Sequence, residues 1–347
     1  MAGGTKGGTP AGIRDLLRDR RIRRLAGAEF VSALGSGIVA ITITFVTYRT
    51  TGSLVRTVLV TAAYTFPAAV LSGWAGHLAD RHDRRRLLVG LSCAKAATYV
   101  AIAAVSFAGV LDANWLLVAS FVAGSLSALV FPAWEEYEKD LIPGDQLAAV
   151  NALFSSMSSV AGLIGAVAGG VIVATIGATT SFVVDALSFV PLIVVIASTR
   201  PEQTTTRGRA YGRGDLRRTF AVVRSNPPLR RAIRNVALLA VLAIPVVQLL
   251  PAIAREIEPG ATTLGFVTAC YTLGGVTVAW VITRVQRLFD RATIVESSFF
   301  LCSIAFVLFG LGGAALNGAE LYVLIAISLL PVGLALSLAQ SVISAIL

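Results

Sequence analysis

The stretch that decides the fold reads GWAGHLADRHDRRRL and runs from Gly73 to Leu87. Apolar runs at residues 55–78 and 87–110 flank it on either side. A helix needs about 20 apolar residues to cross a bilayer core of about 30 Å, and both runs reach that length. The stretch is therefore predicted to contain the end of one membrane-spanning helix and the short basic loop that joins it to the next.

The composition of the whole chain indicates the same class of protein. Of its 347 residues, 56% are hydrophobic and only 14% are charged, whereas soluble domains carry about 25% charged residues. The net charge of +10 can indicate a nucleic-acid partner, but the basic residues lie between the apolar runs and form no basic domain. We therefore predict an integral membrane protein that is surrounded by lipid and binds no nucleic acid.

Apolar segments of spanning length recur along the chain. They predict an all-α polytopic membrane protein of about ten transmembrane helices, at residues 25–47, 55–78, 87–110, 112–134, 147–174, 177–198, 232–254, 261–283, 292–313 and 318–346. The predicted domains are a cytoplasmic basic tail (1–24), an N-terminal six-helix half (25–198), a cytoplasmic linker (199–231) and an incomplete C-terminal half of four helices (232–347).

The basic residues also predict the orientation in the membrane. With the N-terminus inside, 25 of the 29 lysines and arginines fall on the inner side, and only Arg49, Arg56 and Arg255 fall on the outer side. Cytoplasmic loops carry the excess of basic residues in membrane proteins. The chain is therefore predicted to cross a bacterial plasma membrane many times, with a cytoplasmic N-terminus.

Several kinds of chemistry are not indicated. Cys93, Cys270 and Cys302 lie inside apolar runs, without the spacing of a disulfide framework or a zinc site. The two histidines, His77 and His82, lie in one loop, and the phosphate-binding pattern GxxxxGK[ST] is absent. The sequence therefore predicts no enzyme, no metal and no cofactor.

The basic loop resembles the signature G-x-L-A-D-R-x-x-R-R, which joins the second and third helices in the major facilitator superfamily. Asp83 matches the drug and siderophore exporters of that superfamily. Further similar segments are LGSG (34–37), FPA (131–133), LAAVNAL (147–153) and SFVVDALSF (181–189), so the resemblance spans about residues 20–340. It implies a gating motif on the inner side, made by Gly73, Gly76, Asp80, Arg81, Arg84 and Arg85.

Glycines in the predicted helix at 147–174 form a second motif, Gly162, Gly165, Gly169 and Gly170. The first three fall on one helical face, and a smooth face of small residues favours close helix packing in lipid. The segment resembles the antiporter signature G-x-x-x-G-P-x-x-G-G of the superfamily, with Ala166 in place of the proline. Close packing alone and antiport are both consistent with this pattern.

Three ionisable residues lie within apolar runs: Glu29, Lys95 and Asp185. A charge at membrane depth costs about 3 kcal/mol or more, so such residues are candidates for function. Asp185 is the preferred candidate for proton or cation binding, with a packing hydrogen bond or pairing with Lys95 as the structural alternatives. Glu29 can pair with an arginine at the inner interface, and Lys95 can balance an internal acid.

Some positions depart from the superfamily pattern. Ser36 stands where relatives carry an aspartate in the first helix, and Trp134 stands where they carry an arginine. The acidic residues that follow are Glu135, Glu136, Glu138 and Asp140. They are interpreted either as partners of the Arg81–Arg86 cluster across the inner face or as a solvated loop.

These patterns predict a secondary active transporter for proton-coupled efflux of a lipophilic small molecule, such as a drug, an antibiotic or a siderophore, of the multidrug resistance type. The proton gradient is the expected energy source. The superfamily has twelve helices, whereas this sequence stops inside an apolar run at Leu347, so the resemblance implies that two helices are missing. The alternative is a truncated or degenerate protein that serves as a membrane binding or scaffold component without transport.

Overall fold

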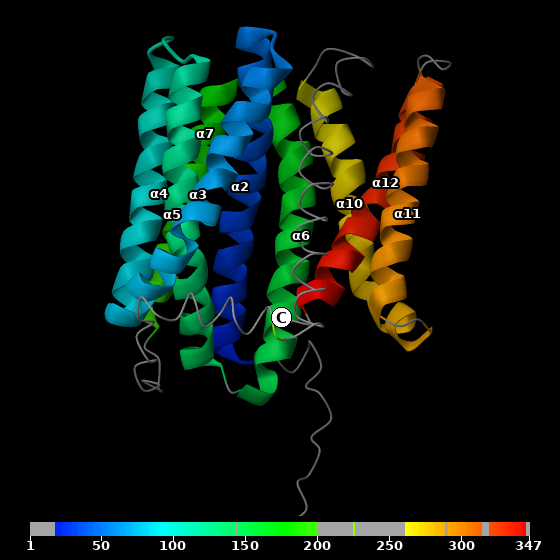
Figure 1. Cartoon of the computed structure of the whole chain (residues 1–347). Coiled ribbons are helices and arrows are strands. Elements are labelled where there is room, and N and C mark those ends of the chain that lie inside the picture. Colours follow the sequence, from blue (N-terminus) through cyan, green and yellow to red (C-terminus); the bar gives the residue numbers. More distant parts are fainter. Residues whose placement is uncertain are drawn as a thin grey trace, which may run out of the picture.

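The computed structural model describes residues 18–142, 144–199, 225, 261–288, 291–313 and 319–344. Within these residues every element is a helix, and the long helices stand side by side (Figure 1). Their bounds are α2 Arg20–Thr51, α3 Leu54–Arg81, α4 Arg84–Phe107, α5 Ala113–Leu141, α6 Gly144–Thr175, α7 Ala178–Ser198, α10 Ala261–Leu288, α11 Arg291–Gly313 and α12 Ala319–Ser344. The predicted span at 232–254 and nearly all of the predicted linker lie outside the described residues. The all-α prediction is confirmed.

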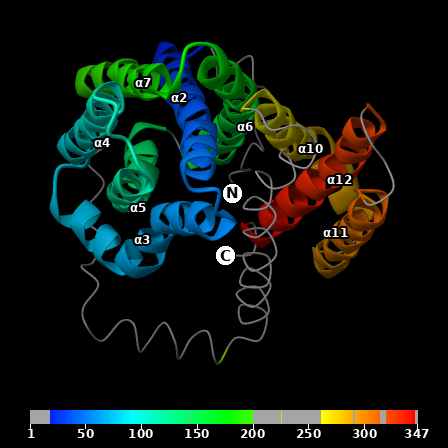
Figure 2. The ribbon, with the colours of Figure 1, turned by 90° about the horizontal axis from the view of Figure 1, so that it is seen from above.

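The described helices form two groups that meet along α6 (Figure 2). In the first group, α3 packs on α5, α4 packs on α5 and α7, and α2 lies between α6 and α7. In the second group, α12 packs between α10 and α11. The most extensive contact between the two groups is that of α6 with α10.

Five of the described helices have stretches long and apolar enough to cross a membrane. These are α2, α4, α5, the Leu153–Thr175 part of α6, and α7. Large apolar side chains such as Phe107, Leu187 and Phe300 point away from the bundle and are mostly exposed. In a lipid bilayer, exposure of these apolar side chains has no cost, because lipid tails are as apolar as the side chains themselves.

Aspartates cap the N-terminal ends of three described helices, α2, α4 and α5. Asp19 accepts a hydrogen bond from the Arg21 amide at 2.7 Å, so α2 begins at Arg20 and includes the end of the predicted tail. Asp83 accepts from the Arg86 amide at 2.8 Å. Asp112 accepts from the amides of Trp115 and Asn114, and these bonds lower the pKa of its carboxyl. An aspartate at this position satisfies amides that have no partner inside the helix.

The α5 helix is longer than the sequence predicted. Its apolar run ends at Trp134, but the helix continues to Leu141, so the second of the two interpretations of the acidic residues, a solvated loop, is wrong. Glutamate and lysine are good helix formers, and nothing breaks the helix until Ile142, which is extended at ψ 129°. Pro143 follows, and a residue before proline is pushed out of the helical conformation.

Candidate functional site

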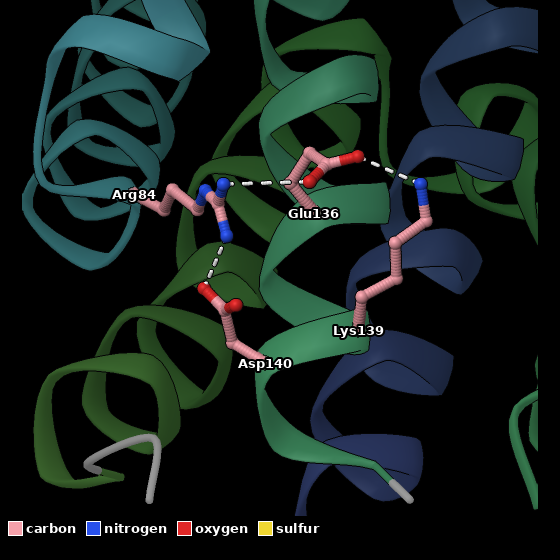
Figure 3. Close-up of polar contacts among 4 residues, drawn as sticks. All are labelled: Arg84, Glu136, Lys139 and Asp140. Carbon is pink, nitrogen blue, oxygen red and sulfur yellow. Dashed lines mark hydrogen bonds and ion pairs between the residues drawn. The ribbon is translucent and has the colours of Figure 1, made fainter. Parts of the chain in front are cut away.

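The start of α4 and the end of α5 are joined by an ion-pair cluster, which we define as Arg84, Glu136, Lys139 and Asp140 (Figure 3). One guanidinium nitrogen of Arg84 lies 2.5 Å from Asp140 Oδ2, and the other lies 3.4 Å from Glu136 Oε2. Lys139 Nζ lies 2.7 Å from the second oxygen of Glu136. The side chains of Arg84 and Asp140 are only 14% and 9% exposed, so their charges depend on each other.

Arg85 ties the same end of α4 to a third helix. Its Nε donates a hydrogen bond of 3.1 Å to the carbonyl oxygen of Ile196, in the last turn of α7. The last carbonyls of a helix have no partner within it and carry partial negative charge, which attracts a cation. Consecutive arginines therefore hold α4 to two neighbours, α5 through Arg84 and α7 through Arg85.

The rest of the predicted gating motif lies at the C-terminal end of α3. Gly73, Gly76 and Asp80 belong to that helix, and Arg81 is its exposed last residue. Of the Arg81–Arg86 cluster, it is Arg84 that pairs with the acidic residues of α5. The Asp80 side chain lies outside what the structure describes, and a gating role for the motif stays a prediction.

Asp185 is completely buried where α7 packs on α2. Its Oδ1 accepts a hydrogen bond of 3.3 Å from Ser188 one turn further along, whereas its Oδ2 has no hydrogen-bond partner among the described residues. Gly35 of α2 faces this carboxyl so closely that an added Cβ would lie 2.6 Å from Oδ1. Ser36, which like Gly35 belongs to α2, also interacts with the Asp185 carboxyl. The site thus holds an acidic group, away from water, with spare hydrogen-bonding capacity.

Lys95 approaches the same region from α4. Its Nζ lies 5.0 Å from the centroid of the Phe189 ring, a cation–π contact, and Phe189 in turn stacks on Tyr99 at 6.2 Å. Among the described side chains Lys95 makes no direct ion pair with Asp185, but its charge acts on both Asp185 and Glu29. The structure therefore brings the three predicted ionisable residues into one electrostatic neighbourhood on α2, α4 and α7.

The glycines of α6 lie against two different helices. An added Cβ at Gly165 would lie 2.7 Å from the Leu34 carbonyl oxygen of α2, and one at Gly169 would lie 2.8 Å from the Ile38 carbonyl oxygen. On the other side of α6, a Cβ at Gly265 of α10 would lie 2.8 Å from the Ala166 carbonyl oxygen and 3.4 Å from the Cα of Gly170. Backbone therefore packs on backbone at both contacts, which only glycine permits.

Gly165→Ala is expected to lower the free energy of unfolding by about 1–3 kcal/mol, because α2 must move to admit the methyl group. Gly162→Ala is the matched control on the same helix, since its Cβ would meet only the Thr272 methyl group at 3.9 Å, and it should change stability by about 0.5 kcal/mol or less. Thermal unfolding of the two purified variants in detergent measures the difference. Equal midpoints would contradict the close packing of α6 on α2.

Sequence reasoning missed the partners of Asp185. It singled out Ser36 only as a departure from a pattern, and it did not select Gly35 or Ser188. The available signal was the spacing of Asp185 and Ser188, three residues apart and so on one helical face. The approach of Gly35 carries no such signal, because it depends on how α2 crosses α7.

The arrangement of the helices is shared with solved membrane transporters. The structure of a bacterial homologue of the human lysosomal transporter Spinster, inward-facing and unoccupied, aligns with a TM-score of 0.68 and 12% identity, over 98% of this chain and 76% of that one. A mutant of the nucleoside transporter NupG aligns with a TM-score of 0.70 and 13% identity, over 94% of this chain and 82% of that one. At this identity the likeness establishes the fold alone.

Sequence comparison defines the family within that class. The family model described as transmembrane secretion effector matches residues 16–343. Macrolide efflux protein A of Streptococcus pyogenes is 21% identical over 82% of this chain and 71% of its own length. The staphyloferrin A transporter of Staphylococcus aureus is 23% identical over 80% of this chain and 70% of its own length. The chain belongs to the transmembrane secretion effector family of the major facilitator superfamily. The resemblance to this superfamily that the sequence indicated is therefore confirmed.

Proposed function

We propose that this protein is a secondary active exporter of a lipophilic small molecule, driven by exchange with protons. One relative is a macrolide efflux protein, which supports export as the direction of transport. Another is a staphyloferrin A transporter, which supports a small organic molecule as the substrate. A macrolide and a siderophore differ greatly in polarity, so the relatives support a small organic substrate more strongly than any single compound. The N-terminus-inside orientation, supported by the excess of basic residues on one side, is part of the proposal.

The observation that carries proton coupling is the burial of Asp185. A carboxyl inside a membrane bundle is costly when charged, so protonation and deprotonation change the stability of the conformation that surrounds it. The contact of Gly35 with this carboxyl connects its protonation state to the packing of α2 on α7. Lys95 supplies the opposing charge nearby. A proton taken up at Asp185 would therefore favour one arrangement of these helices over another.

We propose that the two helix groups move against each other at their contact, and that this movement exposes the substrate site to each side of the membrane in turn. Transporters of this kind expose a central site to each side in turn by rocking one half against the other. The α6 and α10 helices form the most extensive of the described contacts between the groups, with glycine backbone on both sides. The ion-pair cluster and Arg85 hold the inner ends of α4, α5 and α7 together, so the first group can move as one body.

Reconstitution of the full chain into liposomes tests the function. A pH gradient is imposed across the membrane, and a labelled macrolide and a labelled siderophore are offered in separate experiments. At least one compound should accumulate against its gradient in the compartment from which protons leave, and a protonophore should abolish the accumulation. Accumulation that is unchanged by the protonophore would contradict proton coupling. If neither compound accumulates above the level in protein-free liposomes, the proposed export of such substrates is contradicted.

A further inference from the structure

A groove of about 370 Å³ lies between α2 and α7, and Asp185 is not among the residues that line it. Arg24, Gly27 and Ala28 line it from α2, and residues between Pro191 and Ser198 line it from α7. Its volume falls in the range of pockets that hold small molecules. Neither the ion-pair cluster nor the proposed transport site includes any of these residues.

The groove faces outward at the inner ends of its two helices. Arg24 lies near the start of α2 and Ser198 is the last residue of α7, and the start of α2 lies at the rim of the bundle beside α7 (Figure 2). Val194, in the wall of the groove, is 58% exposed. From Ser198 to Pro191 the groove extends about 10 Å along α7, at 1.5 Å per residue. Ser198 ends the apolar span of α7, so the proposed orientation puts this end of the groove at the inner membrane interface and the Pro191 end in the acyl region.

The lining of the groove changes from polar to apolar along α7, from Ser198 towards Pro191. The inner end carries the Arg24 guanidinium and the Ser198 hydroxyl, and the remainder is apolar. Gly27 leaves the apolar part open, because nothing lies within 4 Å of where its Cβ would stand. A ligand that fits must therefore carry an anionic or polar head next to a hydrocarbon chain.

Arg24 is suited to a phosphate head. Its side chain is exposed, and within the described part of the chain it makes no ion pair or hydrogen bond that would occupy its fork of donors. A guanidinium binds phosphate oxygens through two parallel hydrogen bonds. Arg20, also exposed, lies one turn earlier on α2 and adds positive charge at the same level.

We propose that the groove between α2 and α7 is a binding site for an anionic phospholipid of the inner leaflet. The lipid phosphate binds Arg24, and an acyl chain lies over Gly27 towards Pro191. The choice of leaflet rests on the orientation in the proposed function, whereas the binding itself does not depend on transport. Occupation of the groove would stabilise the packing of α2 on α7, the two helices that enclose Asp185.

Native mass spectrometry of the delipidated full chain tests this site. Phosphatidylglycerol should bind at least about tenfold more tightly than phosphatidylcholine, as expected for charge-assisted hydrogen bonds to a net anionic head. Arg24→Gln and Gly27→Leu should each remove most of this preferred binding, the first by removing the cation and the second by filling the groove. The readout is the fraction of protein that carries lipid as the lipid concentration rises.

The chain offers a matched control for each variant. Arg86→Gln removes an exposed inner arginine at the start of α4, and Gly90→Leu adds the same bulk at an exposed glycine of α4 that has nothing within 4 Å of its Cβ position. Both controls should bind phosphatidylglycerol as the unchanged protein does. Loss of binding in the controls as large as in the Arg24 and Gly27 variants would overturn the proposal.

Two further arms separate the possible ligands. Glycerol 3-phosphate carries the head without acyl chains, so it should compete at least about tenfold more weakly than the lipid; equal competition would mean a free-phosphate site and would overturn the proposal. Equal binding of phosphatidylglycerol and phosphatidylcholine would also overturn it. Because no substrate is used, failure of this test leaves the proposed export unaffected, and failure of export leaves this site standing.

Discussion

Asp185→Asn is expected to reduce proton-driven accumulation of substrate in liposomes to the level of protein-free vesicles. Asparagine has nearly the same shape, and its amide oxygen can still accept the hydrogen bond from Ser188 that Asp185 Oδ1 accepts at 3.3 Å. It cannot take up or release a proton. The variant should therefore fold and bind substrate but no longer respond to the pH gradient, and downhill movement of substrate should persist. Transport at several imposed gradients, beside thermal unfolding, measures both parts.

Asp112→Asn is the matched control for this experiment. Asp112 is an exposed carboxylate at the start of α5, and asparagine caps a helix about as well as aspartate does. The control should transport like the unchanged protein, so any loss in Asp185→Asn belongs to that position. Wild-type accumulation and wild-type pH dependence in Asp185→Asn would disprove proton coupling through this carboxyl.

Asp140→Ala is expected to have the largest effect on stability, a loss of about 3 kcal/mol in the free energy of unfolding. Removal of one partner from a buried ion pair leaves an uncompensated charge, which typically costs about 3–5 kcal/mol. The lower end applies here because Arg84 keeps its contact with Glu136 at 3.4 Å. Reversible unfolding of the purified protein in detergent and denaturant measures the change.

Glu136→Gln provides the comparison on the same helix. The Glu136 side chain is 33% exposed, so its pairs are closer to surface ion pairs, which contribute about 0–1 kcal/mol. The double variant Arg84→Gln with Asp140→Asn should lose less stability than Asp140→Ala, because it leaves no unpaired charge. If Glu136→Gln costs as much as Asp140→Ala, the assignment of Asp140 as the principal partner of Arg84 is wrong.

The sequence located the helices well because burial in lipid is a local property of the chain. The predicted span at 177–198 agrees with α7 at Ala178–Ser198, since glycine and polar residues bound the apolar run closely. The predicted helix ends were wrong where polar residues continue a helix past its apolar run. At α5 the acidic residues are helix formers, and the helix stops only before Pro143, so hydrophobicity alone placed the end too early.

The candidate site was predicted as residues but not as an arrangement. Asp185, Lys95 and Glu29 were selected one at a time because each charge is costly within an apolar run. Periodicity identifies the face of one helix on which a residue lies, but it contains no information about which helix packs there. The position of Lys95 over the Phe189 ring, and its lack of a direct ion pair with Asp185, follow from the packing of α4 on α7 and could not be derived in advance.

The sequence by itself therefore determined that this protein lies in a bilayer, that it is built of helices, and that it belongs with the major facilitator transporters. Each of these depends on composition, run length or a short contiguous motif, all of which are local. Only the tertiary structure decided which of two readings of the acidic residues holds, by placing Asp140 against Arg84. It also placed Ser36 and Gly35 beside Asp185. These contacts join residues far apart in the chain, so no local pattern of the sequence contains them. At α2, Gly35 admits the side chains of Asp185 and Ser188 because it has no side chain of its own.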